Sequence, residues 1–393
     1  MVNKSQRREI QQSVGSASGE LQPVVSVVRC ETYELGQIRA ALETVMAPLG
    51  GMRRFVQPGQ RVLLKPNLLK PVPPERGIST HPALVQAVAE AVIEAGGTVW
   101  VGDSPGGPSA RNPQIVKITG AVDAAREAGA ELIIFDQPVW KRVRGIDYFV
   151  APAVLDADLV INLPKLKTHM LTGYTGAVKN LFGAIVGPRK RELHLHAPGI
   201  REFGEVLVDV LELVQPELTI LDGVLGLHGN GPGMSGKSFA YGCLAASTDP
   251  VALDAVIARA MGFRAGEILH LKQSTERGLG ICDAKAVRLE GEPDALRFGR
   301  LDLPRLHWFL HVPQWAGGIV ERWVKVWPVV DASACVGCGR CAEVCPKQVI
   351  SNGRPPAIDL KGCIGCLCCA EICPQGAISP QRNLLAELVG LGI

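Results

Sequence analysis

Eight cysteines near the C-terminus form two copies of one spacing, C-x2-C-x2-C-x3-C, and a proline follows each copy. The first copy contains Cys335, Cys338, Cys341 and Cys345, and the second contains Cys363, Cys366, Cys369 and Cys373. The repeat includes the intervening residues, since CVGCGRCAEVCPKQVI matches CIGCLCCAEICPQGAI. Three thiolates on one tight loop suit three irons of a cubane cluster, whose fourth iron needs a ligand from another segment.

This spacing is typical of bacterial two-cluster ferredoxins, in which the fourth cysteine of each run binds the other cluster. We therefore expect two [4Fe–4S] clusters with interlocked ligands. The expected ligands are Cys335, Cys338, Cys341 and Cys373 for cluster 1, and Cys363, Cys366, Cys369 and Cys345 for cluster 2. Cys368 is surplus and is not an expected ligand. Zinc sites use separated C-x2-C pairs, and disulfides do not suit a chain without a recognisable export signal, so electron transfer is the expected role.

A second group of reactive side chains follows the ends of predicted strands earlier in the chain. They occur in LLKPN, VGDSPGG, INLPKLKTH and LDGVLGLHGNGPG, and the candidates are Lys65, Asn67, Asp103, Lys165, Lys167, His169, Asp222, Gly231 and Gly233. Ligands of open α/β sheets bind beyond the carboxyl ends of the strands. We therefore expect a crevice in which the three lysines hold an anion and His169 transfers protons at neutral pH. The alternative is that these residues only cap the strand ends.

The elements that must position these side chains are short apolar runs alternating with amphipathic ones. Strands are predicted at Val24–Cys30, Arg61–Asn67, Thr98–Asp103, Glu131–Asp136, Leu159–Asn162, Leu218–Asp222, Phe239–Ala246 and Ala286–Leu289. Helices are predicted at Leu35–Met46, Pro82–Ala95, Ile118–Ala128, Ile200–Val214, Pro250–Met261 and Gly266–Arg277, with Thr80 and Asp249 as N-caps. This alternation predicts an α/β fold with a mostly parallel layered sheet, followed by a small ferredoxin-like domain.

Composition along the chain suggests five segments. We expect a disordered polar tail at 1–20, an α/β ligand-binding domain at 21–300, a Trp-rich linker at 301–330, a two-cluster ferredoxin domain at 331–380 and a tail at 381–393. The linker contains Trp308, Trp315, Trp323 and Trp327. Packing between the domains and contact with a membrane surface are both open for this linker.

Several motifs of the body resemble a known family. KPNLL, THPALVQAV, GDSPGG, INLPKLKTH, TGAVKNLFG, LDGVLGLHGNGPG and STDPVALDAV occur in the order found in the family called domain of unknown function 362. The resemblance covers residues 24 to about 290, and members of this family often carry a ferredoxin tail. It therefore implies the architecture of the chain more than its reaction.

One stretch is also similar to the nickel-pincer-nucleotide lactate racemases. It reads His169-x3-Gly173-Tyr174-Thr175-Gly176-x2-Lys179. This resemblance implies that His169 is a catalytic acid/base and that Lys179 tethers a cofactor. A later histidine binds nickel in those enzymes, and His194 or His196 of RKRELHLH could take that place, although this segment itself looks like an exposed strand or loop.

The segment from Gly231 to Ser238 satisfies the P-loop pattern G-x4-G-K-S. A true P-loop opens a helix, whereas the residues after Ser238 read as a strand. Pro232 also removes one of the amides that would cradle a phosphate. We expect this glycine-rich loop to bind an anion without hydrolysing ATP.

Charge and hydropathy exclude some classes of function. The net charge of +3, with no basic run, argues against nucleic acid. No apolar run reaches about 18 residues, so no membrane span is expected, and a reducing cytoplasm suits the thiolates. We expect a cytoplasmic iron–sulfur oxidoreductase that reduces a small anionic substrate or cofactor, with a ferredoxin or reductase as redox partner. The alternatives are an electron carrier or cofactor-assembly protein whose α/β body is a docking module, and a racemase-like metal-cofactor enzyme.

Overall fold

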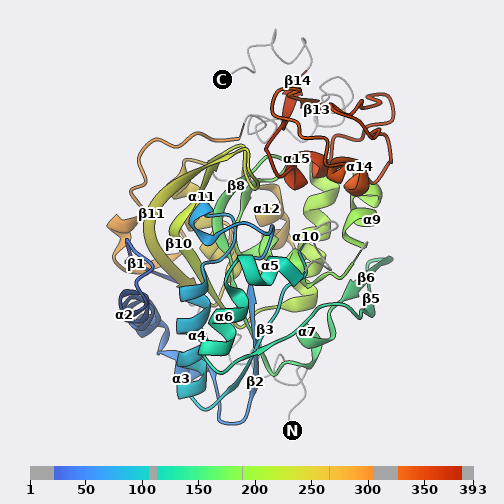
Figure 1. Cartoon of the computed structure of the whole chain (residues 1–393). Coiled ribbons are helices and arrows are strands. Elements are labelled where there is room, and N and C mark those ends of the chain that lie inside the picture. Colours follow the sequence, from blue (N-terminus) through green and yellow to red (C-terminus); the bar gives the residue numbers. More distant parts are fainter. Residues whose placement is uncertain (1–21, 106–112, 188, 265, 305–325, 383–393) are drawn as a thin grey trace.

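The computed structural model describes residues 22–105, 113–187, 189–264, 266–304 and 326–382 (Figure 1). The tail expected at 1–20, nearly all of the tail expected at 381–393 and most of the expected linker lie outside these residues, as do Trp308, Trp315 and Trp323. None of the helices in the described ranges is both long and apolar enough to cross a membrane.

A ten-stranded sheet forms the centre of the body, in the order β12-β1-β11-β10-β7-β2-β3-β4, with β8 and β9 attached beside β10. Its strands are β1 Val24–Arg29, β2 Arg61–Pro66, β3 Thr98–Val101, β4 Glu131–Leu132, β7 Leu159–Leu163, β8 Lys165–His169, β9 Gly173–Thr175, β10 Leu218–Gly229, β11 Gly236–Ser247 and β12 Arg288–Gly291. Strands β10, β7, β2, β3 and β4 are parallel, and β11 is antiparallel to β10 and β1. The prediction of a mostly parallel α/β sheet is confirmed.

Helices cover both faces of this sheet (Figure 1). The body contains α2 Leu35–Met46, α3 Met52–Phe55, α4 Pro82–Glu94, α5 Pro113–Ile118, α6 Ala121–Glu127, α7 Pro152–Asp156, α8 Ala177–Asn180, α9 Arg189–His196, α10 Ile200–Val214, α11 Pro250–Met261 and α12 Leu269–Glu276, and a hairpin of β5 Val139–Val143 and β6 Ile146–Val150. One apolar core lies beneath α2, α4 and α6, and the other beneath α8, α10 and α11. Along β2, Val62 and Leu64 enter the first core and Leu63 the second, because successive side chains of a strand point to opposite faces.

One of the two predicted N-caps is confirmed, and two other local expectations need correction. Asp249 is the N-cap of α11, with its carboxylate accepting from the backbone N–H groups of Val251 and Ala252. Thr80 does not cap α4, since His81 holds that position. The hydroxyl of Thr80 instead donates to the carbonyl of Leu163 at 2.7 Å. The second correction concerns RKRELHLH, which forms α9 because its tertiary contacts override the alternation of its sequence.

The C-terminal unit contains two short helices and a two-stranded antiparallel sheet formed by its first and last segments. It consists of β13 Val326–Val330, α14 Arg340–Val344, α15 Cys368–Ile372 and β14 Ile378–Arg382, and β13 pairs with β14. Gly337 and Gly365, which follow the first cysteine of each run by two residues, have φ angles of 70° and 68°. A residue without Cβ adopts this left-handed conformation at little cost, so both cysteine loops can turn tightly.

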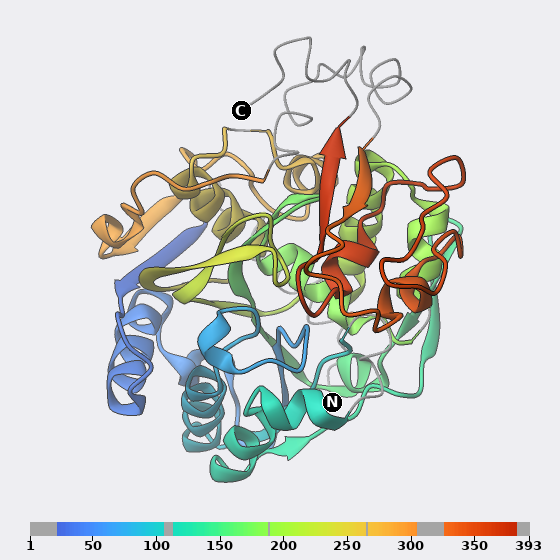
Figure 2. The same cartoon turned by 45° about the horizontal axis from the view of Figure 1, so that its top comes forward.

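The C-terminal unit packs against the body at the end of the sheet where β2, β3 and β7 finish, with α14 and α15 beside α9 and α10 (Figures 1 and 2). Met170, from the segment after β8, is only 2% exposed and belongs to the apolar core of the C-terminal unit. The guanidinium of Arg191 on α9 donates to the carbonyl of Glu343 at 3.1 Å. The unit therefore closes the edge of the sheet at which ligands of α/β proteins bind.

Candidate functional site

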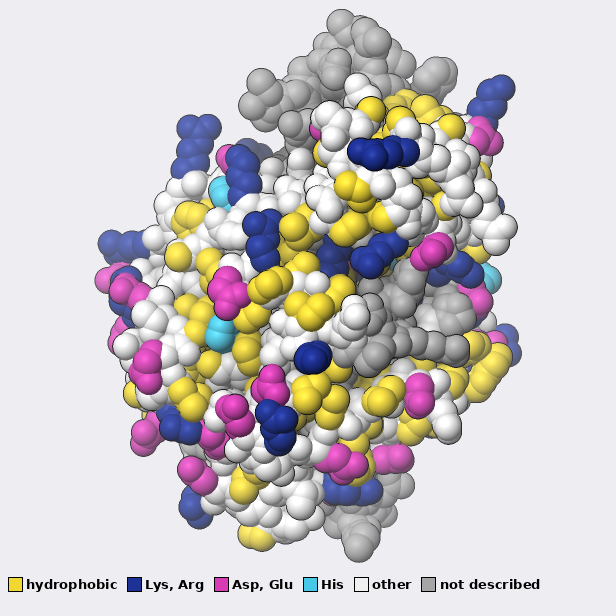
Figure 3. Space-filling model, viewed as in Figure 1, with side chains coloured by type: hydrophobic (Ala, Val, Ile, Leu, Met, Phe, Trp, Pro, Cys, Tyr) yellow, Lys and Arg dark blue, Asp and Glu magenta, His cyan; other side chains and the backbone are white. Residues whose placement is uncertain are grey.

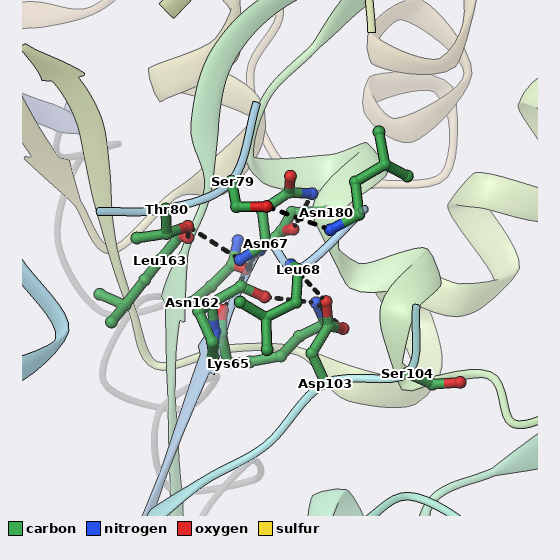
Figure 4. A network of polar contacts seen from close by, with 12 residues as sticks. Lys65, Asn67, Leu68, Ser79, Thr80, Asp103, Ser104, Asn162, Leu163 and Asn180 are labelled. Carbon is green, nitrogen blue, oxygen red and sulfur yellow. Dashed lines mark hydrogen bonds and ion pairs between the residues drawn. The ribbon is translucent and has the colours of Figure 1, made fainter. Parts of the chain in front are cut away.

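The floor of the site is a buried ion pair between the ends of β2 and β3. The ammonium of Lys65 donates to one carboxylate oxygen of Asp103 at 2.8 Å, and the other oxygen accepts from the backbone N–H of Leu68 at 2.8 Å (Figure 4). Gly183 lies against this pair, and a Cβ at that position would overlap both side chains. A glycine is therefore required there by packing. Lys65 holds Asp103 in place and does not itself line the cavity described below.

A chain of three amides extends the floor from Asn67 to Asn180 and Asn162. The amide of Asn67 donates to the side-chain oxygen of Asn180 at 2.9 Å, and that of Asn180 donates to Asn162 at 2.8 Å (Figure 4). The oxygen of Asn67 is left to accept from the ammonium of Lys167 at 2.7 Å. The network orients Lys167, whose ammonium also donates to the carbonyl of Ile78.

Lys165 and Asp222 form a separate buried network on the side of the sheet near β1. The ammonium of Lys165 donates to Asp222 at 2.8 Å and to the hydroxyl of Tyr33 at 2.7 Å. Tyr33 donates to Asp222 at 2.7 Å and stacks on the ring of His81, whose backbone N–H also donates to Asp222. These groups satisfy one another, and neither Lys165 nor Asp222 lines the cavity.

A cavity of about 120 Å³ lies between this floor and the C-terminal unit. The body contributes cations and histidines to its wall, namely Lys70, Lys167, Lys179, Lys190, Arg191, His169 and His194, together with Asn67, Asp103, Ser104 and Thr175. The C-terminal unit contributes Val344, Cys368, Glu371 and Ile372. The carboxyl ends of three strands and the cysteine-bearing helix α15 thus enclose one space.

Burial lowers the pKa of the lysines around this cavity. The pKa of Lys167 and that of Lys190 both fall to about 7, and Glu371 opposes the shift only in part. Burial also lowers the pKa of Lys179. Its ammonium lies 5.7 Å from the ring centroid of Phe182 and 5.3 Å from that of Phe203, so aromatic faces stabilise its charge.

His169 is held in one tautomer by its own turn. Its Nδ1 accepts from the backbone N–H groups of Leu171 and Thr172 at 3.1 and 3.3 Å, so Nε2 carries the proton. Nε2 is buried and has no hydrogen-bond partner in the described part of the chain, and it lies 3.8 Å from a carboxylate oxygen of Glu371. Burial lowers the pKa of His169 well below its usual value. The neutral ring is therefore ready to donate a hydrogen bond through Nε2.

The glycine-rich loop connects β10 to β11 and faces the C-terminal unit. Pro232 lines the cavity, and a Cβ on Gly233 would lie 2.9 Å from the carbonyl oxygen of Glu371. Gly231 packs against the backbone of Thr168 in the same way. Lys237 lies on β11, where its exposed ammonium pairs with Asp302 at 2.6 Å. Because a strand follows the loop, it lacks the geometry of a P-loop.

The eight cysteines of the repeat line two further cavities of the C-terminal unit. One is lined by Cys335, Cys338, Cys341 and Cys373, and the other by Cys345, Cys363, Cys366 and Cys369. These are the two interlocked sets that the spacing predicts. Among the described residues, no three His, Cys, Asp or Glu side chains converge on a position for a single ion. Each cavity brings together four thiolates, and a cubane cluster takes one thiolate on each of its four irons, so the donor sets fit two cubane clusters.

Comparison with known families agrees with this geometry. Residues 327–374 match the 4Fe-4S dicluster domain. The fold and the cysteines thus define an iron–sulfur protein in which a ferredoxin-type unit follows an α/β body along the chain. Residues 62–259 match the family described as Domain of unknown function (DUF362). The chain belongs to this family, which confirms the resemblance found in its motifs.

Similar proteins have also been described. The chain is 42% identical over 241 residues to "Thylakoid-associated protein sll1697" of Synechocystis sp., an alignment covering 59% of this chain and 73% of that protein. The lactate racemase apoprotein of Thermoanaerobacterium thermosaccharolyticum is 12% identical, with a TM-score of 0.36 and coverage of 58% of this chain and 55% of the racemase. A Thermotoga maritima protein has 12% identity, a TM-score of 0.33 and coverage of 49% and 51%. The chain thus spans about half the length of these solved structures.

The structure adds residues to the site that the motifs did not indicate. Lys70, Lys190 and Glu371 line the cavity, and Cys368, expected only to be surplus, lines it too. Ser104, which belongs to the motif VGDSPGG, also lines the cavity. Lys190 lies in RKRELHLH, which looked like an exposed segment, and Glu371 lies between two expected cluster ligands. The sequence held one sign of this contact between the C-terminal unit and the cavity, which is that Cys368 belongs to neither set of cluster ligands.

Proposed function

We propose that this protein is an iron–sulfur oxidoreductase that exchanges electrons between two [4Fe–4S] clusters and a small anionic ligand bound in the cavity. The observation that carries the proposal is the shared wall of the cavity, which joins buried lysines of the body to Cys368, Val344 and Ile372 of the C-terminal unit. When bound, the clusters supply electrons one at a time. A ligand in this cavity lies next to the helix that bears cluster ligands.

The position of Cys368 indicates which cluster-binding loop adjoins the cavity. Cys368 lies between Cys366 and Cys369, both expected ligands of cluster 2, and Val344 precedes Cys345, a third ligand of that set. Cys338, an expected ligand of cluster 1, is exposed to solvent. We infer that a redox partner, a ferredoxin or a reductase, docks near Cys338 while the ligand faces the Cys368 side.

The cavity residues divide the remaining work. The ammonium groups of Lys167 and Lys190, with pKa values of about 7, are suited to release protons near neutral pH. Nε2–H of His169 donates a hydrogen bond to an oxygen that gains negative charge, since Nδ1 is occupied and the ring stays neutral. Lys179 fixes the anion. A two-electron reduction of the ligand would take up two protons, which these lysines supply and recover from water.

The cellular location is a separate proposal. Cluster thiolates favour a reducing compartment, and we propose the cytoplasm. In that compartment we do not expect the protein to bind nucleic acid. Acidic and basic side chains are intermixed on the face shown in Figure 3, whereas a surface that binds a polyanion has a continuous basic stripe. The similar Synechocystis protein is named as thylakoid-associated. Fractionation of cells would test the proposal, and recovery of the protein in washed membranes would contradict it.

The experiment for the redox proposal begins with anaerobic purification of the full chain. An enzyme of this kind is expected to retain a small molecule, which native mass spectrometry detects, or to oxidise its reduced clusters when given a small-molecule extract of its host. Copurification of a protein, with no small-molecule ligand and no reoxidation, would contradict the proposal and favour a carrier or cofactor-assembly role.

A further inference from the structure

The charges around the cavity are strongly unbalanced. Lys167, Lys179 and Lys190 border it from three elements, β8, α8 and α9. Of the two carboxylates in the described wall, Asp103 is already paired with Lys65 at 2.8 Å. Glu371 is left as the negative group that acts on all three lysines. Buried cations need compensating charge, so the wall has capacity for more than one negative charge on a ligand.

Three buried polar atoms in the same wall lack a hydrogen-bond partner among the residues that the structure describes. They are Oγ of Ser104, Nε2 of His169 and Oγ1 of Thr175. The residues are 3%, 4% and 4% exposed, respectively. Leaving a buried polar group unpaired costs about 1–3 kcal/mol, and native proteins rarely keep several such groups together. All three can donate to anionic oxygens, which gives an independent sign of a ligand with several acceptors.

The size of the cavity limits what can enter. Its volume of about 120 Å³ is somewhat smaller than the roughly 150 Å³ cavity that holds benzene in another protein. A small organic molecule of roughly the size of benzene therefore suits this space, which also opens toward solvent. Leu68, Phe182 and Ile372 add apolar surface to the wall, so a short carbon skeleton is accommodated as well.

We propose that the ligand of this cavity is a small organic dianion, carrying two carboxylates or one phosphate on a short carbon skeleton. The inference rests on the redox function proposed above and specifies its substrate class. Lys179 and Lys190 hold the negative groups, and Ser104, His169 and Thr175 donate to their oxygens. Carboxylate and phosphate offer the same chemistry to this wall, so the choice between them is left to the test.

The test measures binding in the oxidised holoprotein, where no electron transfer takes place. Calorimetry under anaerobic conditions at constant ionic strength would compare succinate, a dicarboxylate, with butyrate, which has the same number of carbons and one carboxylate. Ethyl phosphate is the third probe and represents a phosphate on a short carbon skeleton. We expect succinate or ethyl phosphate to bind at least about tenfold more tightly than butyrate, with the tighter of the two identifying the acidic group.

Matched lysine variants complete the test. Lys179→Met and Lys190→Met should each remove most of the preference for the dianion, whereas Lys237→Met, which removes an exposed lysine outside the cavity, should leave it unchanged. Iron content and the melting temperature report whether each variant is folded. Equal binding of butyrate, binding of none of the three probes, or an unchanged preference in both cavity variants would overturn the proposal. Tight binding of a dianion, together with no reoxidation of the reduced clusters by the retained ligand or a small-molecule extract of the host, would instead contradict the redox function and leave the ligand class standing.

Discussion

The ammonium of Lys70 donates a hydrogen bond of 2.9 Å to the carbonyl oxygen of Cys373, which joins the loop after β2 to an expected ligand of cluster 1. Lys70 is only 3% exposed, and burial lowers its pKa to about 8, so it is still largely charged at pH 7. A buried positive charge beside a cluster favours the more negative, reduced form. We therefore expect the body to affect the electron affinity of the unit that it contacts.

Replacing Lys70 should make one cluster harder to reduce. In Lys70→Met the midpoint potential of one cluster should shift to a more negative value, as measured by a redox titration followed by EPR. The control is Lys347→Met, which removes an exposed lysine from the loop after Cys345, where solvent screens the charge. An equal shift in both variants, or none in Lys70→Met, would show that the contact does not tune the cluster.

The cluster count can be tested directly. Anaerobically prepared protein should contain about eight iron and eight sulfide per chain, as two cubanes require. Cys368→Ser should keep this content, because Cys368 belongs to neither ligand set, whereas Cys369→Ser should lower it. Chemical analysis of iron and sulfide measures both. A loss of half the iron in Cys368→Ser would mean that the ligand sets are assigned wrongly.

The sequence predicted the framework better than the cavity. All eight predicted strands and all six predicted helices exist, because their apolar periodicity reflects burial along the chain. The sequence did not predict the hairpin of β5 and β6. It also did not predict the helix in RKRELHLH, which places Lys190 in the cavity through tertiary packing that local pattern does not encode.

Local sequence pattern also fails to show which polar side chains near strand ends reach the cavity. Asn67 and Asp103 follow β2 and β3 and line the cavity, as expected for an α/β crevice. Lys167 and His169 line it too, but they lie within β8, where the sequence predicted a loop after a strand. Asp222 also follows a strand-like run, yet it pairs with Lys165 inside the protein. Contacts between segments distant in the sequence decide whether a charged side chain faces the cavity or forms an ion pair inside the protein.

The P-loop-like segment should not bind nucleotides. Lys237 lies on a strand and pairs with Asp302, so it cannot reach a phosphate held by the loop. Lys237→Ala is therefore expected to leave ATP affinity unchanged, with weak binding in both proteins by equilibrium dialysis. Micromolar ATP binding that disappears in this variant would contradict the assignment and point to an ATP-driven reductase.

Anion binding should weaken as the pH rises. The pKa values of Lys167 and Lys190 are about 7 in the free cavity, and a bound anion raises them because it favours the ammonium forms. Binding then takes up protons, so affinity is greatest below pH 7 and falls by up to about tenfold per pH unit above it for each proton taken up. The other ionisable groups of the wall are Lys70, Asp103, His169, Lys179, Arg191, His194, Cys368 and Glu371.

Succinate is a suitable probe for this dependence over a pH range in which it stays fully ionised. Calorimetry in two buffers with different ionisation enthalpies would give the number of protons taken up. The dependence should be reduced in Lys190→Met. An affinity that is constant from neutral to alkaline pH would contradict the protonation of these lysines on binding.

The most direct test of the account is reoxidation of the reduced clusters through the cavity. The protein, purified anaerobically with its retained ligand or supplied with a small-molecule extract, would be photoreduced and its absorbance followed. His169→Ala should slow reoxidation by roughly 10²–10³-fold, the usual cost of losing a donor to a developing oxyanion, with iron content unchanged. His169→Gln keeps an N–H donor and should recover part of the rate, while Lys179→Met should lose the ligand. Reoxidation at the wild-type rate in His169→Ala and Lys179→Met alike would contradict the account and place the chemistry outside this cavity.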